Sequence, residues 1–341
     1  SPGTYQENVN IEDRSVTLAS LFFTTGDIAY VSSTIIDAGS NGSAIEITGE
    51  YNDQNTSIIS GFTIEDASSA GVWANSYNSI SIDQCIIQDN DGFEGGGVSA
   101  PYDVNTLKIK NTVIRSNDGG GNIGGGVAAG SPNSGMDRFE MYNSLVYGNN
   151  NVNDGGGLFI NSDVTIIVNS TIAKNEANGP GSGIIFYSSS NDSTLILNSI
   201  ISDNQSNNIF GEEGSDIYQA NNNPILLRNS YLNYALSNLA RDANNFINTN
   251  SPFLDASSND FNLSSSSPTL GSGLASIVFE GETISAPVAD YLGTSRPSPV
   301  GSILDIGAIE SPLSKKITRF YVANTGSNSQ IGDVDAPFQT I

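Results

Sequence analysis

The sequence predicts an all-β solenoid, in which short strands coil around a common core and each coil stacks on the next. One phrase recurs along the chain: alternating apolar residues, an Asn, a small hydroxyl residue and more aliphatic residues, as in Leu107-Lys-Ile-Lys-Asn-Thr-Val-Ile114. Its period is 26 to 32 residues, by subtraction of the marker positions. A repeat this short cannot bury its apolar face alone and must stack on its neighbours. The marker position holds Gln84, Asn111, Asn143, Asn169, Asn198 and Asn229.

The spacing of apolar residues predicts a strand, then a corner, then a second strand in every repeat. Alternation with a period of two puts Leu107 and Ile109 on one face, and after Asn111 the inward set changes parity to Thr112 and Ile114. Asn tolerates a left-handed corner, and its amide both donates and accepts hydrogen bonds. We therefore expect stacked Asn side chains to form a ladder. A second set follows with matched steps, at Asn90, Asn117, Asn149, Asn175 and Asn204.

Glycine runs open the next strand of each coil. Gly95-Gly-Gly-Val98, Gly124-Gly-Gly-Val127 and Gly155-Gly-Gly-Leu158 each follow a loop rich in Asp and Asn. A phosphate-binding loop needs a helix start behind it and usually a Lys, and neither is present. We interpret these runs as tight turns where backbones pack closely.

Together these motifs resemble the right-handed parallel β-helix, or pectate-lyase-like, superfamily, and within it the secreted repeat proteins of bacterial surfaces. Pro2-Gly-Thr-Tyr-Gln-Glu-Asn-Val-Asn-Ile11 is similar to the first strand of such domains, and Asp305-Ile-Gly-Ala-Ile-Glu310 is similar to their closing segment. The resemblance implies a right-handed parallel β-helix with an Asn ladder and a C-terminal cap. It also implies a location outside the cell or on its surface. It specifies the fold much more strongly than any activity.

The composition restricts the partners. The chain of 341 residues has 36 acidic and 12 basic residues, no His and a formal net charge of -24. Nucleic acids, anionic lipids and acidic polysaccharides need clustered Lys or Arg, so we expect none of them as partners. No apolar run reaches the roughly 18 residues that span a membrane, and we expect no membrane insertion. The single cysteine, Cys85, falls in the inward column of small residues and is interpreted as a buried spacer.

The chain divides into one solenoid and a short tail. Residues 1–310 are predicted to form the β-helix, with 234–310 as its final coils and cap, and 311–341 are a linker plus a further segment. Residues 320–341 resemble the stretch with which such domains usually begin. Either a tandem array is cut out of phase, or the tail of one unit caps the next, or the boundary of the fragment ignores the domains. The first two alternatives imply head-to-tail continuation with neighbouring copies.

Catalysis is weakly supported. In this superfamily the chemistry is carried by the strand after the glycine turn, and lyases need a Lys or Arg as base. The best basic cluster is Lys108, Lys110 and Arg115, but alignment of the coils pairs Lys108 with Glu140 and Lys110 with Asp83, which are ordinary cross-strand pairs. The outward residues after the glycine turns are inert: Trp73, Ser99, Ala128, Phe159 and Ile185. A polysaccharide lyase is the least favoured function, and no cofactor is required.

Two binding functions are alternatives. Trp73 and Phe159 are candidate platforms for the rings of a neutral carbohydrate. Acidic loops are candidate Ca²⁺ sites, because calcium prefers oxygen ligands. The carboxylates that we single out are Asp89, Asp91, Asp333 and Asp335.

A stripe of outward aliphatic residues favours assembly. It consists of Ile166, Val168, Leu195, Leu197 and Leu226, where earlier coils have polar residues. Such a stripe should not face water alone, so we expect either segment 234–310 or a neighbouring subunit to cover it. The tail adds Phe320, Tyr321 and Phe338 as candidate interface residues. The favoured function is therefore a secreted structural or adhesive unit that repeats head to tail in a surface protein or filament.

Overall fold

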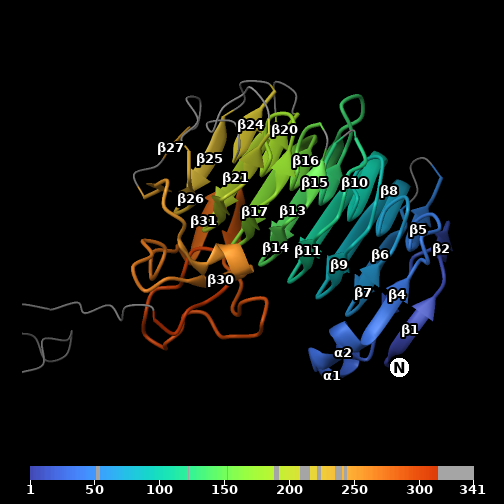
Figure 1. Ribbon diagram of the computed structural model, residues 1–341, viewed down its shortest axis with the longest axis horizontal. Helices are drawn as coiled ribbons and strands as arrows, with labels where there is room; N and C mark the ends of the chain where they lie inside the picture. The colour runs from blue at the N-terminus through green and yellow to red at the C-terminus, as the bar shows by residue number, and fades with distance from the viewer. Residues whose placement is uncertain are drawn as a thin grey trace, which may run out of the picture.

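The structure, a computed structural model, describes residues 1–50, 54–121, 123–151, 153–187, 192–207, 216–220, 224–234, 240–241 and 244–313. These residues are mostly β, with very little helix, and form a column of stacked parallel strands (Figure 1). The predicted parallel solenoid is confirmed.

One long face of the column is a single parallel sheet with one strand from each coil, and its neighbours pair in chain order. Its strands, in spatial order, are β1 (Gly3–Gln6), β4 (Thr34–Asp37), β7 (Thr63–Glu65), β9 (Ile86–Gln88), β11 (Val113–Arg115), β14 (Leu145–Tyr147), β18 (Thr171–Ala173), β22 (Ile200–Ser202), β26 (Tyr231–Leu232) and β28 (Phe246–Ile247).

The second sheet bends around the column and supplies two faces. Its two longest strands, β8 (Val72–Asp83) and β10 (Val98–Lys110), run through the bend, so the faces are continuous there. Before the bend lie β2 (Val9–Glu12), β5 (Ile45–Thr48), β12 (Val127–Ala129), β16 (Leu158–Ile160), β20 (Ile184–Phe186) and β24 (Ile217–Gln219). After it lie β3 (Thr17–Ala19), β6 (Thr56–Ser60), β13 (Met136–Tyr142), β17 (Ser162–Val168), β21 (Ser193–Leu197), β25 (Ile225–Arg228) and β27 (Ala240–Arg241).

The remaining elements are short. A small parallel sheet contains β15 (Asn150–Asn151), β19 (Glu176–Ala177) and β23 (Gln205–Ser206). Two antiparallel hairpins follow the column, β29 (Phe253–Asp255) with β30 (Asp260–Leu263) and β31 (Ser276–Phe279) with β32 (Glu282–Ser285). The helical turns are α1 (Phe22–Thr25), α2 (Ala29–Ser33) and η2 (Ala256–Ser258). No helix within the described ranges has the length and apolar character needed to cross a membrane.

The core lies inside the column, where the alternation of the sequence predicts it. Leu107 and Ile109 stack on Phe139 and Met141 of the next coil, and all four side chains are at most 1% exposed. Cys85 is also buried, in the inward column of small residues, so its interpretation as a buried spacer is confirmed. Burial of apolar area is the main stabilising term in such a column.

The marker residues form a left-handed corner, as predicted. Gln84, Asn111, Asn143, Asn169, Asn198 and Asn229 have φ angles between +46° and +53°. Their side chains bond to one another in pairs rather than in one run: Asn143 Nδ2 donates to Asn111 Oδ1 at 2.7 Å, and Asn198 Nδ2 donates to Asn169 Oδ1 at 3.1 Å.

The continuous ladder is formed by the second set of Asn residues. Nδ2 of each member donates to Oδ1 of the next, at 2.9–3.0 Å, along Asn90, Asn117, Asn149, Asn175 and Asn204. The backbone N–H groups of Asn117 and Asn149 donate to the next Oδ1 as well. Asp216 ends the ladder by accepting from Asn204 Nδ2 at 3.1 Å. Because these amides are buried, the ladder supplies partners that water cannot.

Small hydroxyl residues form another column just after the marker corner. The backbone N–H of each donates to the hydroxyl of the next coil, for example Thr112 N to Ser144 Oγ at 3.3 Å and Ser144 N to Ser170 Oγ at 3.3 Å. The same contact continues from Ser170 to Ser199 and from Ser199 to Ser230. The recurring Ser or Thr of the sequence therefore has a hydrogen-bonding role.

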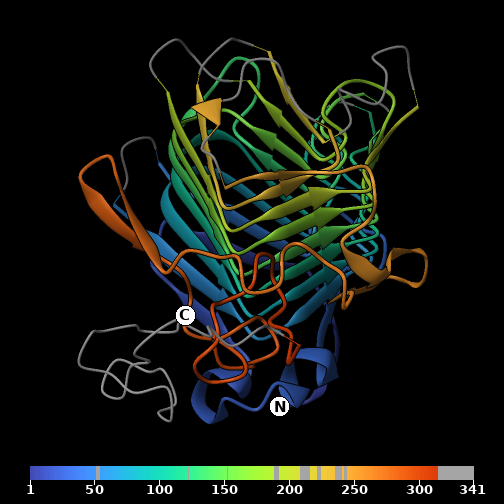
Figure 2. The same ribbon diagram turned by 90° about the vertical axis from the view of Figure 1, so that its left-hand side faces the viewer.

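Residues 253–311, which we call the strap, run along one side of the column. Figures 1 and 2 show the strap on the same side as α1 and α2. Its backbone carbonyls accept hydrogen bonds from the marker corner: Ser272 from Asn229, Leu274 from Asn198 and Ala289 from Asn143. The sequence predicts a cap at the end of the column, whereas these contacts place the strap along its flank. Along the flank the strap supplies hydrogen-bond acceptors for the corner amides and shields the apolar residues beside them from water.

Candidate functional site

The face that follows the glycine turns is largely covered. Of the outward residues named above, Ser99 and Phe159 are 1% exposed, Ala128 is 0% exposed and Ile185 is 2% exposed. Ala128, Phe159 and Ile185 pack in one apolar cluster with Ile123, which lies in the loop before a glycine turn. These outward residues contribute no acid or base to the face.

The glycine turns themselves make this cover possible. Gly155 and Gly181 have φ angles of +69° and +67° and lie against Ile185, and a Cβ on either would come within 2.9 Å of that side chain. Only glycine combines this left-handed backbone with so close an approach. The interpretation of the glycine runs as tight, closely packed turns is confirmed.

The two candidate sugar platforms differ in exposure. The Phe159 ring stacks on Tyr187 with their centroids 5.8 Å apart, and the buried ring offers no open face to a ligand. Phe159 is covered by the adjacent loop and coil, so its ring is not accessible in this structure. Trp73 is half-buried, and for this residue sugar binding stays a prediction.

The basic cluster belongs to a structural ion network. Lys108 lies opposite Glu140 in the strand register and forms a salt bridge with it, as the alignment of coils predicts. Arg138 also binds Glu140, and its Nη2 reaches Glu282 of the β31–β32 hairpin at 2.8 Å. Burial alone would raise the pKa of Glu140, but the hydrogen bonds from Lys108 and Arg138 outweigh it and lower this pKa. The network thus ties the hairpin to the column.

The other two basic residues lie apart from this network. Lys110 lies opposite Asp83 in the register. Arg115 lies on β11, beyond the corner at Asn111, and its Nη2 donates to Gln88 Oε1 at 2.5 Å. The structure therefore places Lys108 and Lys110 two residues apart on β10 and Arg115 beyond the corner on β11.

Asp89 and Asp91, the described candidates for calcium ligands, lie at a corner and in a backbone bridge of their coil. Asp89 has a φ angle of +54° and forms a corner of its coil, and Asp91 forms a parallel bridge with Asp118. Over the described ranges, no group of three or more His, Cys, Asp or Glu residues is arranged to hold a metal ion. Asp333 and Asp335 lie outside the described residues, as do Phe320, Tyr321 and Phe338.

The aliphatic stripe is an internal interface. Ile166, Val168, Leu195 and Leu197 are at most 1% exposed and pack with Phe279 and Ile284 of the β31–β32 hairpin, and Leu226 joins them. Of the two expected covers, the chain's own closing segment is the one found. The four buried residues of the stripe therefore offer no open surface to a neighbouring copy.

Arg296 is the centre of the contact between the strap and the column. Its guanidinium donates to Asn143 Oδ1 at 3.0 Å, to Gly307 O at 2.9 Å and to Glu310 Oε2 at 3.1 Å. Arg296 and Glu310 side chains are 1% and 0% exposed. Burial raises the pKa of Glu310 to about 7, and the nearby Asp305 carboxylate acts in the same direction.

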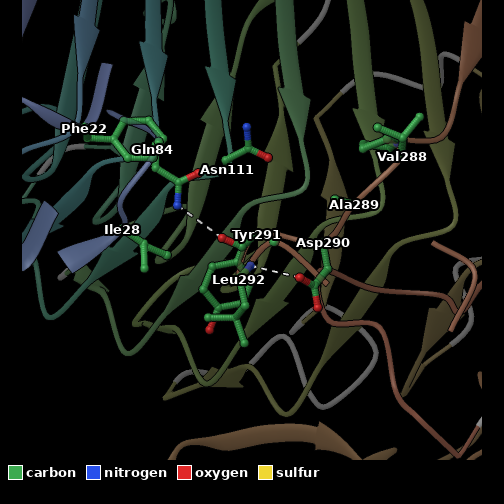
Figure 3. A pocket seen from close by; sticks show the side chains of 12 residues that line it. Phe22, Ile28, Gln84, Asn111, Val288, Ala289, Asp290, Tyr291 and Leu292 are labelled. Carbon is green, nitrogen blue, oxygen red and sulfur yellow. Dashed lines mark hydrogen bonds between the residues drawn. The ribbon is translucent and has the colours of Figure 1, made fainter. Parts of the chain in front are cut away.

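An open cavity lies between the strap and α1, over the marker corner. It has a volume of about 510 Å³, and Figure 3 shows Phe22 and Ile28 on one side and Tyr291 and Leu292 on the other. Gln84 lies at its floor and donates from Nε2 to Tyr291 O at 3.1 Å. A second cavity of about 330 Å³ shares Tyr291 and Leu292 with the first. We call the two together the corner cleft.

The sequence analysis did not identify the corner cleft. One signal was present, since Gln84 is the single Gln in a marker column of Asn. Like the Asn side chains of later corners, Gln84 donates to a carbonyl of the strap. The strap wall, Tyr291 and Leu292, has no periodic pattern that could have placed it beside Gln84.

Comparison with protein-family models, with curated proteins and with solved structures finds no match for this chain. Its fold and its surfaces are therefore the basis for assigning a function.

Proposed function

We propose that this chain is a structural, non-catalytic unit of an extracellular scaffold whose copies join head to tail. The observation that carries the proposal is the state of the column ends. Among the residues that the structure describes, β1, β2 and β3 at one end each pair with a strand on one side only, and β28 at the other end pairs with β26 alone. Unpaired strand edges are templates for the addition of further strands.

The flanks support the same function. The strap covers the corner and the aliphatic stripe, and the glycine turns cover the face that carries chemistry in the superfamily the sequence resembles. Lys108, the best placed candidate base, is held by Glu140. Backbone edges at the two ends are the surfaces best suited to a partner copy. A net charge of -24 disfavours broad side-by-side contact between copies.

A substitution in β2 tests the role of the edge. The backbone N–H of Val9 bonds to Ala44 O at 2.9 Å and that of Asp13 bonds to Thr48 O at 3.0 Å, so by alternation the N–H of the exposed Asn10 points away from the column. Asn10→Pro removes this outward donor and keeps the inner pairing, while Asn10→Ala keeps the donor.

Light scattering over a range of concentrations provides the readout. We expect association in the parent chain and in Asn10→Ala, and weaker association in Asn10→Pro. A parent chain that stays monomeric at every concentration would contradict association of copies through the β2 end of the column. Association that is unchanged by Asn10→Pro would contradict it as well.

A further inference from the structure

The corner cleft has the features of a built binding site that the scaffold role does not need. Its main cavity, at about 510 Å³, has the size of a small-ligand pocket. It lies where two separate segments, α1 and the strap, approach each other over the two successive coils of Gln84 and Asn111 (Figure 3). Ile28 and Leu292 on its walls are 45% and 52% exposed.

The charges of the main cavity point to an uncharged ligand. No Lys or Arg is among the residues that line it in the described part of the chain, so it offers nothing to neutralise an anion. Its carboxylate, Asp290, is buried and already saturated. Asp290 Oδ1 accepts from the N–H groups of Leu292 and Thr294, and Oδ2 accepts from that of Glu310, at 2.7–3.0 Å.

The floor of the main cavity is polar, and its amides have hydrogen-bonding groups that are available to a ligand. Gln84 uses one N–H on Tyr291 O, and the described residues give its Oε1 no partner. Asn111, beside it, donates to Asp83 at 2.8 Å and has a second amide hydrogen. A ligand without hydrogen-bond donors that covered this floor would leave Gln84 Oε1 buried without a hydrogen bond, which is unfavourable.

We propose that the main cavity of the corner cleft binds a neutral carbohydrate, with a sugar ring against the side chains of Phe22 and Tyr291 and its hydroxyls on the Gln84 and Asn111 amides. Sugars combine an apolar ring face with hydroxyl donors and acceptors, which matches these walls and this floor. The site lies on the flank of the column, so the ends remain available for neighbouring copies. It differs in position from Trp73, which lies on the second sheet.

The test measures binding of short neutral oligosaccharides of glucose, xylose, mannose and galactose to the full chain, by ligand-observed NMR and calorimetry. The main variant is Gln84→Asn, which installs the residue of the other marker corners, keeps the left-handed backbone and shortens the side chain by one methylene. Tyr291→Ala removes the ring. Phe93→Ala is the matched control, because Phe93 is an aromatic residue 68% exposed outside the cleft.

We expect at least one neutral oligosaccharide to bind, Gln84→Asn to weaken it by roughly three- to tenfold, and Tyr291→Ala to weaken it by about tenfold or more. Phe93→Ala and Trp73→Ala should bind as the parent does. The proposal is overturned if no neutral oligosaccharide binds, if binding depends on Trp73 and not on Tyr291, or if only apolar peptides bind. Association through the column ends is measured separately with Asn10→Pro. Failure of carbohydrate binding can therefore be distinguished from failure of head-to-tail association.

Discussion

The guanidinium of Arg296 donates to Asn143 Oδ1 at 3.0 Å and joins two segments that lie 153 residues apart in the chain. Arg296 takes the place that the next Asn of the marker column would fill, so the Asn pairs of that column are interrupted at Asn143. One buried cation therefore connects the strap, through Glu310, to a corner of the column. The strap in turn covers the apolar outer surfaces of both sheets.

Removing this cation should release the strap. Arg296→Met leaves Glu310 buried without its partner, and loss of one member of a buried pair costs about 3–5 kcal/mol. We expect chemical denaturation to show this loss and limited proteolysis to cut within 253–311. Arg296→Met combined with Glu310→Gln should recover part of the stability. Unchanged stability in Arg296→Met would contradict the role of Arg296 in holding the strap.

The Asn ladder gives a second prediction. Asn149 donates to Asn175 Oδ1 at 2.9 Å and to Ile114 O at 3.0 Å, and its Oδ1 accepts from Asn117 Nδ2 at 2.9 Å. Asn149→Ala leaves these buried groups unpaired and should lower the free energy of unfolding by about 2–4 kcal/mol. Asn178→Ala is the control, because Asn178 is exposed, and its effect should be small. Equal effects would mean that the ladder adds little stability.

Two glycines allow the stability cost of a steric clash to be measured separately from the cost of a left-handed backbone. A Cβ on Gly126 would lie 2.6 Å from Gly157 O, whereas Gly148 has a φ angle of +61° and open space around it. We expect Gly126→Ala to cost about 3 kcal/mol through the steric clash and Gly148→Ala to cost about 1 kcal/mol through the left-handed backbone. Thermal denaturation of the two variants checks the order, and the reverse order would be incompatible with the stacked glycine turns.

Buried carboxyl groups predict a pH dependence. Burial raises the pKa of Asp216 from 3.8 to about 7, and burial likewise raises that of Glu310 from 4.5 to about 7. A carboxyl whose pKa is higher in the folded state keeps its proton more tightly there, so stability is greatest below the unfolded pKa and falls as pH rises towards about 7.

Denaturation at a series of pH values between about 4 and 8 checks this direction. Asp216→Asn should flatten part of the slope, and Asp216→Asn with Glu310→Gln should flatten more of it. Asp255→Asn is a control outside the core, because the Asp255 carboxylate is exposed and its pKa is lowered by the Ser257 and Ser258 hydroxyls. Stability that rises across the same interval would contradict the burial of these acids.

The thiol provides a probe of the intact column. Cys85 is 1% exposed, and burial raises its pKa to about 12. Because the thiolate is the reactive form, thiol reagents should leave the folded protein unmodified and react fully after denaturation. Rapid modification under native conditions would show that the coil around Cys85 opens easily.

The features that recur in every coil could be predicted from the sequence, whereas the position of the non-repeating segment could not. The inward pair Leu107 and Ile109, the left-handed corner at Asn111 and the glycine turns all recur with one period, and stacking of coils turns that period directly into contacts. The outward stripe at Ile166 and Leu195 was visible as an anomaly, but the sequence could not decide between segment 234–310 and a neighbouring subunit as its cover.

The strap explains what was missed. Residues 253–311 have no repeat of their own, and their position depends on single contacts such as Arg296 with Asn143. For the same reason the corner cleft could not be predicted: Gln84 stood out in its column, but Tyr291 lies 207 residues further along the chain. The burial of Phe159 was not predicted, because alternation indicates that a side chain points outward and not whether a loop covers it.

Electron microscopy of the concentrated full chain tests most directly whether copies join through the ends of the column. The scaffold role predicts elongated particles in which successive columns lie end to end along one axis, and fewer of them in Asn10→Pro than in Asn10→Ala. Single columns at every concentration, or columns associated side by side through the strap, would contradict it.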